Sequence, residues 1–395
     1  MENLLEGMRV LDLTRVLAGP YASMILADLG AEVIKVELPE KGDESRSFGP
    51  FQNGESAYFA SVNRGKKSVT IDLRREAGAQ LVRRLALECD VLIENFRPGS
   101  MARFGLEYER IHKENQRLVY ASISGFGQTG PYAQRPAYDV IVQAMGGIAS
   151  ITGEPGGAPV RVGSSVGDLS AALFGVIGIL AAWGRAKENG QGQQIDISML
   201  DCQVALLENA ISRFYVNGDV PQPLGSRHPA ITPFQFFLAS DGYIVIAAGN
   251  DSLWQKLCGA LGREELAADS RFFDNALRTK NHAQLEPLLQ SAFSERSVAE
   301  WCDTLGAAGI PSSPIHSVAD VCADEQVAAR QMIVDLVHPI AGQQTMPNSP
   351  FKFSQTPVRL REPAPTLGQH TEDVLTSLLG LSADEIAGLQ DEDVL

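Results

Sequence analysis

The chain has 395 residues, and 33 Lys plus Arg against 48 Asp plus Glu give it a formal net charge of −15. Hydrophobic residues make up 44% and charged residues 21%, which is typical of a globular protein. The acidic balance argues against a nucleic-acid-binding protein, which needs a broad basic surface. At roughly 150 residues per domain, the length predicts two domains.

The sequence also argues against membrane insertion, secretion and a metal site. The longest apolar run, Ala172 to Trp183, is shorter than the roughly 20 residues that span a bilayer. The N-terminus lacks the basic and apolar segments of a signal peptide. The five cysteines form no Cys-x-x-Cys pair, and the six histidines have no metal-binding spacing. We therefore expect a cytoplasmic protein with reduced cysteines and no metal.

Strand and helix signals alternate in the first half of the chain. Strands are predicted at residues 9–13, 32–37, 68–73, 90–94, 118–122 and 194–198. Helices are predicted at residues 19–29 and 76–88, and a long apolar helix from Asp168 to about Gly190. This alternation predicts an α/β fold with a doubly wound parallel sheet, which binds ligands beyond the carboxyl ends of its strands. Residues 1–200 are predicted to form this large domain.

The composition changes after about residue 200. A linker helix and a loop rich in Pro and Gly are predicted over residues 201–231, and a smaller α+β domain over residues 232–325. This domain opens with a hairpin around Ser240-Asp241-Gly242, a strong turn signal. Residues 326–395 are predicted to return to the large domain through an extended, proline-bearing linker and two short helices at the C-terminus. Ser382 and Glu385 fit a capping box at the second of these helices.

The common phosphate-binding and nucleophile motifs are missing. The turn after the first predicted strand, Thr14 to Pro20, holds one glycine where a dinucleotide-binding turn would have G-x-G-x-x-G. The sequence also lacks the G-x-x-x-x-G-K-[S/T] loop of many ATP-dependent enzymes and the G-x-S-x-G nucleophile elbow. The sequence therefore lacks the usual motifs of a dinucleotide-binding enzyme, of an ATP-dependent enzyme and of a serine hydrolase.

Asp168 is the most informative acidic residue. Seven glycines lie between Met145 and Asp168, and the long apolar helix begins at this point. From spacing alone, Asp168 is either an ordinary N-cap, which only satisfies the first backbone N–H groups, or a nucleophile. In the second case the positive end of the helix favours the ionised, nucleophilic carboxylate by about 0.3–1 kcal/mol.

Several long motifs resemble the family III CoA-transferases, the group of formyl-CoA and carnitine CoA-transferases, over nearly the whole chain. They lie at Gly7 to Glu37, Asn95 to Gly99, Gly125 to Tyr132, Tyr138 to Gly175 and Leu367 to Thr371. The resemblance implies that Asp168 is the covalent nucleophile and that coenzyme A thioesters are substrates, with no permanently bound cofactor. It also implies an interlocked homodimer, in which each chain forms an open ring threaded by the other.

The chemistry implied is an exchange of one thioester for another. Asp168 would form a mixed anhydride with the acyl group of the donor and then an aspartyl-CoA thioester, so ATP is not needed. The glycine-rich segment is expected to supply backbone N–H groups to the oxyanions and to shield the anhydride from water. We expect no general base, because an ordinary carboxyl is ionised at pH 7.

The resemblance also places coenzyme A. The residues that it implies for CoA binding are Val16, Ile71, Arg74, Asn95, Phe96, Arg97, Arg103, Pro136 and Tyr138. From the sequence alone each arginine is equally open to being a solvated surface charge. Arg97 is the strongest candidate among them, because it directly follows a predicted strand and precedes Pro98-Gly99.

Departures from the formyl-CoA transferases bear on the acid substrate. Leu17 stands where those enzymes have a glutamine, and Leu38 where they have a CoA-contacting arginine. These changes argue against formyl-CoA and oxalate, and the pattern is closer to the succinyl-CoA:dicarboxylate branch, the glutarate and itaconate CoA-transferases. The residues expected at the acid substrate are Leu17, Asp139, Arg227 and His228. Arg227 or His228 would pair with a distal carboxylate, although an ordinary loop arginine fits the sequence equally well.

Two other functions fit parts of the sequence. An α-methylacyl-CoA racemase shares the fold but needs two opposed bases, and Tyr138 stands where racemases have a histidine. An acyl-CoA-binding protein without catalysis would not need Asp168 beside a glycine-rich loop. The CoA-transferase is therefore the function that the sequence favours.

Overall fold

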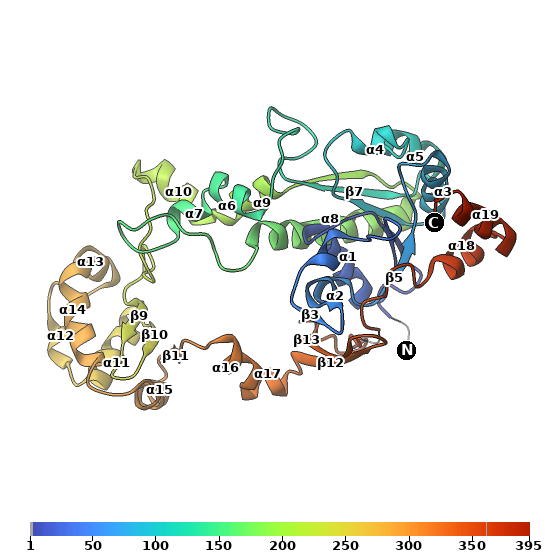
Figure 1. Ribbon diagram of the computed structural model, residues 1–395. Helices are drawn as coiled ribbons and strands as arrows, with labels where there is room; N and C mark the ends of the chain where they lie inside the picture. Colours follow the sequence, from blue (N-terminus) through green and yellow to red (C-terminus); the bar gives the residue numbers. More distant parts are fainter. Residues whose placement is uncertain (1–2, 361) are drawn as a thin grey trace. The chain divides into compact units, whose positions relative to one another are not determined.

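The chain forms two compact units in the computed structural model, which describes residues 3–360 and 362–395 (Figure 1). The first unit comprises Met1–Ile148, Arg161–Ser212 and Gln326–Leu395, and the second Ala149–Val160 and Arg213–Glu325. The predicted small domain, residues 232–325, falls within the second unit. Three helices lie at the junctions of the two units: α7 (Ile148–Ile151), α10 (Glu208–Asn217) and α17 (Glu325–Ala329).

A six-stranded parallel sheet is the centre of the first unit, in the order β5-β2-β1-β6-β7-β8. Its strands are β1 (Arg9–Asp12), β2 (Glu32–Glu37), β5 (Lys66–Thr70), β6 (Val91–Glu94), β7 (Val119–Ser124) and β8 (Gln194–Ser198). This confirms the predicted α/β class with a doubly wound parallel sheet. The strand predicted at residues 68–73 begins two residues earlier, because Lys66 and Lys67 pair with β2.

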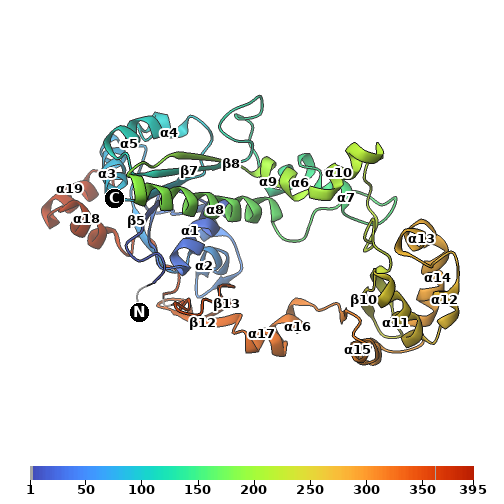
Figure 2. The same ribbon diagram turned by 180° about the vertical axis from the view of Figure 1, so that it is seen from behind.

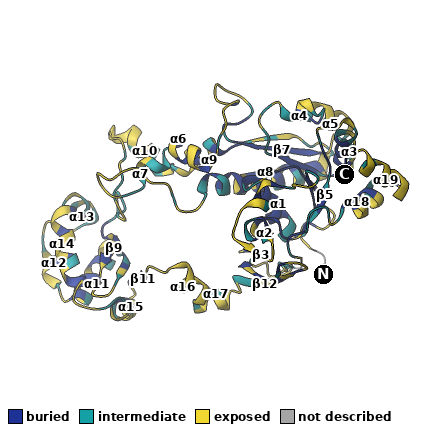
Figure 3. Ribbon diagram, in the orientation of Figure 1, coloured by how far each residue is buried: buried dark blue, intermediate teal, exposed yellow. Residues whose placement is uncertain are grey.

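Alternate side chains of the strands enter two separate hydrophobic cores. Val10, Val33 and Val91 pack on one side of the sheet with helices α1 (Ala18–Asp28) and α8 (Val166–Asn189). Their neighbours Leu11, Ile34 and Leu92 pack on the other side, mainly with helices α3 (Glu76–Leu87), α5 (Tyr108–Glu114), α18 (Thr371–Leu379) and α19 (Ala383–Asp391). The central strands β1, β2, β6 and β7 are buried on both faces, as parallel strands between two helical layers require, whereas the edge strand β8 is partly exposed (Figure 3).

The order of the strands reverses at β1. From β1 the chain first moves outward through β2 to β5 and then returns to β6 on the other side of β1. Loops that leave β1 and β6 therefore diverge, and the crevice between them is where doubly wound sheets bind ligands.

Helix α8 is the longest helix of the described chain and begins just before Asp168. By length and composition alone it is apolar enough to cross a membrane, and it extends on both sides of the apolar run Ala172 to Trp183. It packs against α1, β7 and β8 as a core helix of the first unit (Figure 2). Packing against the sheet accounts for the apolar residues on its buried face, whereas Leu173, Phe174 and Ile177 are exposed.

The remaining elements of the first unit surround the sheet. They are η1 (Glu44–Ser47), β3 (Phe51–Gln52), β4 (Glu55–Ser56), α2 (Ala57–Asn63), α4 (Ser100–Arg103), α6 (Asp139–Met145), α9 (Met199–Leu206), β12 (Ile333–His338) and β13 (Gly342–Pro347). The hairpin of β12 and β13 corrects the expectation of an extended linker from residue 338 onward, because six paired residues follow each other in register. Ser382 and Glu385 form the predicted capping box of α19.

The second unit has its own core around an antiparallel sheet in the order β11-β10-β9. Its elements are β9 (Phe234–Leu238), β10 (Tyr243–Ala247), α11 (Asp251–Leu261), α12 (Glu264–Ala268), α13 (Asn275–Lys280), α14 (His282–Phe293), α15 (Val298–Ala307), β11 (Ser312–Pro314) and α16 (Val318–Ala323). The predicted hairpin is present as β9 and β10. Arg278 is fully buried and donates to the carbonyl oxygens of Thr232, Phe272 and Gly249.

Candidate active site

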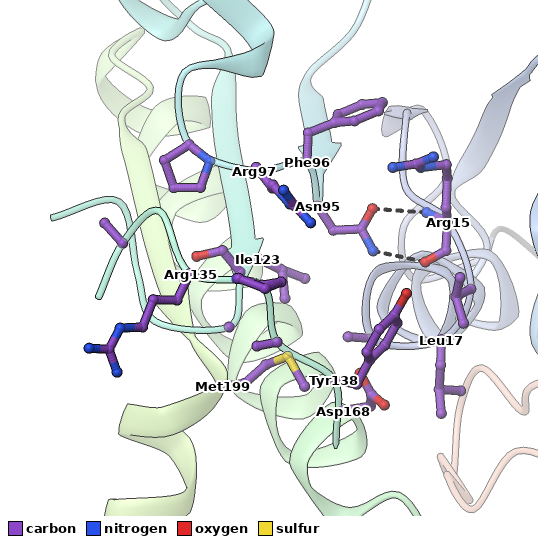
Figure 4. Close-up of a pocket in the computed structure, with 18 of the residues that line it drawn as sticks. Arg15, Leu17, Asn95, Phe96, Arg97, Ile123, Arg135, Tyr138, Asp168 and Met199 are labelled. Atoms are coloured by element: carbon purple, nitrogen blue, oxygen red, sulfur yellow. Dashed lines mark hydrogen bonds between the residues drawn. The ribbon is translucent and has the colours of Figure 1, made fainter. Parts of the chain in front are cut away.

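A pocket of about 260 Å³ lies at the carboxyl ends of β1, β6 and β7, where the order of the strands reverses. It is lined by Arg15, Val16, Leu17, Ala18, Glu44, Asn95, Phe96, Arg97, Pro98, Ile123, Ser124, Gly125, Ala133, Arg135, Pro136, Ala137, Tyr138, Asp168 and Met199. Figure 4 shows Asp168 in the same part of the pocket as Tyr138, Leu17 and Met199. We call this cavity the reaction pocket.

The turn that carries Val16 is held in a strained conformation. Val16 has a φ of 68°, a left-handed value that a β-branched residue rarely adopts. The carboxylate of Asp43 accepts a hydrogen bond from the Val16 N–H at 3.1 Å. Asn95 holds the preceding residue, because its amide accepts from the Arg15 N–H at 2.9 Å and donates to the Arg15 carbonyl at 2.8 Å (Figure 4). Side chains from two other segments therefore hold the turn in this strained conformation.

Buried charges support this turn from below. Lys35 is fully buried, forms an ion pair with Asp43 at 2.9 Å and donates to the Thr14 carbonyl at 2.7 Å. Burial by itself would raise the pKa of the Asp43 carboxyl, but Lys35 and Ser45 outweigh it and hold that pKa below its usual range. The Asp43 carboxylate is therefore ionised and available to the Val16 N–H at neutral pH.

Asp168 is the third residue of α8 and lies half-buried in the reaction pocket. The N-cap of the helix is Ser165, whose side chain makes no capping hydrogen bond, so Asp168 is not an N-cap. Within the described chain no hydrogen bond to the Asp168 carboxyl is found. Burial, followed by the nearby charge of Asp139, raises the pKa of Asp168 to about 7.

This raised pKa corrects the expectation that Asp168 is fully ionised at pH 7. A carboxyl with a pKa near 7 is about half protonated at that pH. The helix terminus favours the anion by only about 0.3–1 kcal/mol, which is less than the cost of burying the charge beside a second carboxylate.

The glycines of the glycine-rich segment that belong to the first unit, Gly146, Gly147, Gly163 and Gly167, do not line the reaction pocket, contrary to expectation. The lining includes Gly125 and none of these four. A Cβ on Gly156 or Gly163 would meet no atom within 4 Å, whereas close packing explains two others: one on Gly167 would lie 2.9 Å from Asp139 Oδ1, and one on Gly147 3.0 Å from Leu207 Cδ1. The glycines serve packing at these positions rather than contact with a ligand.

A second pocket, of about 660 Å³, lies beside the first and is called the outer pocket here. Arg15, Glu44 and Phe96 line both pockets and form their common wall. The Arg15 guanidinium lies 4.9 Å from the centre of the Phe96 ring and pairs with Glu44 at 2.6 Å. The outer pocket also has Lys41 and Arg74 in its lining, so cationic side chains line this pocket as well, farther from Asp168.

The structure brings most of the predicted residues to these two pockets. The reaction pocket is lined by Val16, Leu17, Asn95, Phe96, Arg97, Pro136, Tyr138 and Asp168, and the outer pocket by Ile71, Arg74 and Phe96. Arg74 is held by Asp72 in a forked ion pair, with Nη2 at 2.7 Å from Oδ2. Arg103 is the exposed last residue of α4 and lines neither pocket.

Of the other three residues predicted at the acid substrate, Asp139 belongs to the first unit and Arg227 and His228 to the second. Asp139 is buried and lines neither pocket. In the second unit, the Arg227 Nε is buried without a partner among the described residues. Burial also lowers the pKa of Arg227, against the opposing charge of Glu286. His228 Nδ1 accepts a hydrogen bond from the Ala230 N–H at 3.1 Å.

Sequence reasoning missed several lining residues. Arg15, Glu44, Arg135 and Met199 line the reaction pocket without having been predicted there. Arg15 and Arg135 had a usable signal, since each stands beside a predicted site residue in a turn after a strand. Glu44 and Met199 come from distant segments and had none.

The fold and the site together define an α/β protein with a half-buried carboxyl at the reversal point of its sheet. The profile of CoA-transferase family III matches residues 5–371, and the chain belongs to this family and thus to the transferase class of enzymes.

Among its relatives, the succinyl-CoA:glutarate CoA-transferase of Mus musculus is 42% identical over 95% of this chain and 86% of the relative. The acetyl-CoA:oxalate CoA-transferase of Acetobacter aceti is 44% identical over 88% and 89%. A crystal structure of a CAIB/BAIF family protein from Brucella suis has a TM-score of 0.85 and 41% identity, covering 95% of this chain and all of that one.

Proposed function

We propose that this enzyme transfers CoA from an acyl-CoA donor to a dicarboxylic acid and that Asp168 carries the exchange covalently. The position of a half-buried carboxyl without hydrogen-bond partners, in the reaction pocket at the start of α8, is the observation that supports this role. Among the described residues, no donor has to be released before these oxygens attack.

The steps balance without a cofactor or water. An ionised Asp168 oxygen attacks the thioester carbonyl, the C–S bond breaks, and CoA leaves as the thiolate. The thiolate then attacks the aspartyl carbonyl of the anhydride, which releases the donor acid as a carboxylate and leaves an aspartyl-CoA thioester. The acceptor carboxylate attacks this thioester and expels the thiolate. The thiolate finally attacks the acyl carbonyl of the new anhydride, which yields the product thioester and regenerates the Asp168 carboxylate.

The two pockets suggest how CoA lies. The outer pocket is large enough for the nucleotide end, and the smaller reaction pocket suits the thioester end. The diphosphate of CoA joins these two ends, so we place it at the common wall, beside the Arg15 guanidinium and the exposed Arg97. Asn95 then acts through the Arg15 backbone that it holds.

The acid substrate is proposed from the relatives and from the pocket. Both relatives named above carry a dicarboxylic acid in their names, glutarate in one and oxalate in the other. Leu17 gives the reaction pocket an apolar side beside Asp168, which favours an acid with a methylene chain such as succinate or glutarate. The unpartnered Nε of Arg227 remains our candidate for the distal carboxylate.

Trapping the covalent adduct tests the function. Incubation with succinyl-CoA followed by hydroxylamine should convert Asp168 to its hydroxamate, which mass spectrometry detects as a shift of one peptide. Asp168→Asn should abolish both the adduct and transfer. Asp201→Asn is the matched control, because Asp201 is also the third residue of its helix, α9, but is exposed and outside the pocket. Full transfer by Asp168→Asn would overturn the proposal.

A panel of substrates tests the acid. Succinyl-, acetyl- and oxalyl-CoA would be offered with glutarate, itaconate, oxalate and a monocarboxylate as acceptors. We expect the highest kcat/KM for a pair with methylene-containing dicarboxylates. Incorporation of solvent deuterium at the α-carbon without any acceptor would instead indicate racemase chemistry.

We also propose that the enzyme is a cytoplasmic homodimer. All five cysteines are free, which suits a reducing compartment. On α8, Leu173, Phe174 and Ile177 are exposed apolar side chains of the first unit, and a patch of this kind is typical of a surface covered by another chain.

A further inference from the structure

Asp139 lies beside the nucleophile but does not reach the pocket. It is the first residue of α6 and is buried, and α6 packs against α8. Its Oδ1 accepts a hydrogen bond from the Gly167 N–H at 2.8 Å, one residue before Asp168. Its Oδ2 accepts from Gln143 Nε2 at 2.7 Å, and Arg161 Nη1 lies 3.4 Å from the same oxygen.

Gln143 also binds the start of the segment that leads into α8. Gln143 is fully buried, and its Oε1 accepts from the Val162 N–H at 2.8 Å. Asp139 and Gln143 therefore fix the segment at both ends, at Val162 and at Gly167. The arrangement replaces a conventional N-cap, since the Ser165 side chain does not cap the helix.

The fit between Asp139 and the helix start leaves no spare room. A Cβ on Gly167 would lie 2.9 Å from Asp139 Oδ1 and 2.6 Å from Val142 Cγ2. The Gly167 N–H of α8 thus contacts the Asp139 carboxylate directly, and this contact fixes the direction of the next side chain, Asp168.

The two carboxyls differ in what stabilises their charge. Asp139 receives hydrogen bonds from Gly167 and Gln143 and faces the Arg161 cation, whereas Asp168 has no such donor within the described residues. The third titratable group close to both is Tyr58 of α2, whose pKa is raised by burial and then by Asp168, Asp43 and Asp139. Hydrogen-bond donors therefore stabilise a negative charge on Asp139 and not on Asp168 within the described residues.

We propose that Asp139 is a positioning residue, which fixes the backbone of the nucleophile and, as a neighbouring carboxylate, favours the acylated form of Asp168 over the free carboxylate. Acylation removes the charge from Asp168, so the repulsion between the two carboxylates is present in the free enzyme and absent in the anhydride and the thioester. The inference rests on the proposed function of Asp168.

The charge and the hydrogen bonds of Asp139 can be separated by two variants. Asp139→Asn removes the charge and the hydrogen bond from Gln143 Nε2 but keeps an acceptor for the Gly167 N–H. We expect the midpoint of the pH–rate profile to move to lower pH by about one unit, because the pKa of Asp168 falls when its anionic neighbour is lost. The steady-state fraction of enzyme trapped by hydroxylamine should fall as well.

Asp139→Ala removes the hydrogen bonds too. We expect kcat to fall about 100-fold at every pH, with a KM for succinyl-CoA within about threefold of the parent, because a misplaced nucleophile costs rate rather than CoA binding. Asp196→Asn is the control: its carboxylate also accepts from a backbone N–H, that of Gln128 at 2.9 Å, but does not adjoin Asp168. It should leave the pH midpoint unchanged.

The outcomes distinguish the two proposals. If the parent enzyme forms the Asp168 adduct and Asp139→Asn keeps the parent pH midpoint and trapped fraction, the role of Asp139 is overturned while the nucleophile stands. If the parent enzyme transfers CoA without any adduct on Asp168, the proposed function itself is overturned. A shifted midpoint in a folded Asp139→Asn variant supports the inference.

Discussion

The ionisation of Asp168 sets the first prediction, which concerns pH. Its pKa is raised to about 7, and the nucleophile is the ionised form, so kcat/KM should rise with pH through about 7 and level off above about 8. Initial rates between about pH 5.5 and 9 measure this. Burial also raises the pKa of Glu94 to about 7, and Glu94 accepts from the Phe96 N–H, so Glu94→Gln serves as the control that should keep the midpoint. A rate already constant at pH 5.5 would contradict the prediction.

The same residue should lower the stability of the fold at neutral pH. Its pKa is higher in the folded chain than the usual value of 3.8, so the folded state is favoured below pH 3.8 and loses this advantage as pH rises through about 7. Asp168→Asn should therefore raise the free energy of unfolding by on the order of 2 kcal/mol above pH 7, and by less at pH 5. Urea unfolding at both pH values is the measurement, and equal stability of the two proteins at pH 8 would count against a buried charge.

Arg15 gives a prediction about the part of CoA that is bound at the common wall. Arg15→Ala should raise the KM for succinyl-CoA at least tenfold, since a charge-assisted hydrogen bond to phosphate is lost. The KM for succinyl-pantetheine, which has no diphosphate, should stay the same. Arg75→Ala is the control, because Arg75 is exposed and lines neither pocket. An equal loss with both thioesters would place Arg15 elsewhere in the reaction.

Among single residues, the sequence identified those site residues that stand in a local motif. Asn95 and Arg97 directly follow a predicted strand, and Asp168 stands at the start of the predicted long helix, after the glycine-rich segment. The burial of Lys35 and its pairing with Asp43 were not predictable, because a lysine in the middle of a strand looks like an exposed residue until the second helical layer is known. The raised pKa of Asp168 likewise depends on Asp139, whose distance to it is set by the packing of α6 on α8.

Helix α8 is the element on which the site depends, and two of its glycines should respond in opposite ways. A Cβ at Gly184 has open space, so Gly184→Ala should raise the free energy of unfolding by about 0.5–1 kcal/mol and leave transfer unchanged. A Cβ at Gly167 would collide with Val142 and Asp139, so Gly167→Ala should lower stability by about 1–3 kcal/mol and reduce kcat. Unfolding curves and transfer rates of both variants decide this, and a stable, fully active Gly167→Ala protein would contradict it.

The elements with clear hydrophobic periodicity were predicted within a few residues, as β1, β2, α3 and β8 show. The hairpin of β12 and β13 was missed, because Gly342–Pro347 is polar and ends in proline, and its pairing with Ile333–His338 is a tertiary fact. Helix α14 was missed for a related reason: Pro287 lies inside it, and a proline usually ends a helix.

At the scale of the whole molecule, the exposed apolar side chains of α8 predict self-association. Light scattering should give the mass of a dimer at all concentrations between about 0.1 and 10 µM. Ile177→Glu, which places a charge at the most exposed apolar position of α8, should weaken or abolish the dimer. A parent protein that stays monomeric and active over this range would refute the proposal.

The wall shared by the reaction pocket and the outer pocket also has a consequence for the evolution of such an enzyme. If CoA is bound on one side of Arg15 and Phe96 and its thioester is exchanged on the other side, the affinity for CoA does not depend on the acid that CoA carries. Substitutions around Leu17 can then alter which acids are accepted without weakening the binding of the nucleotide. New metabolic specificities would arise by small steps from an already competent catalyst.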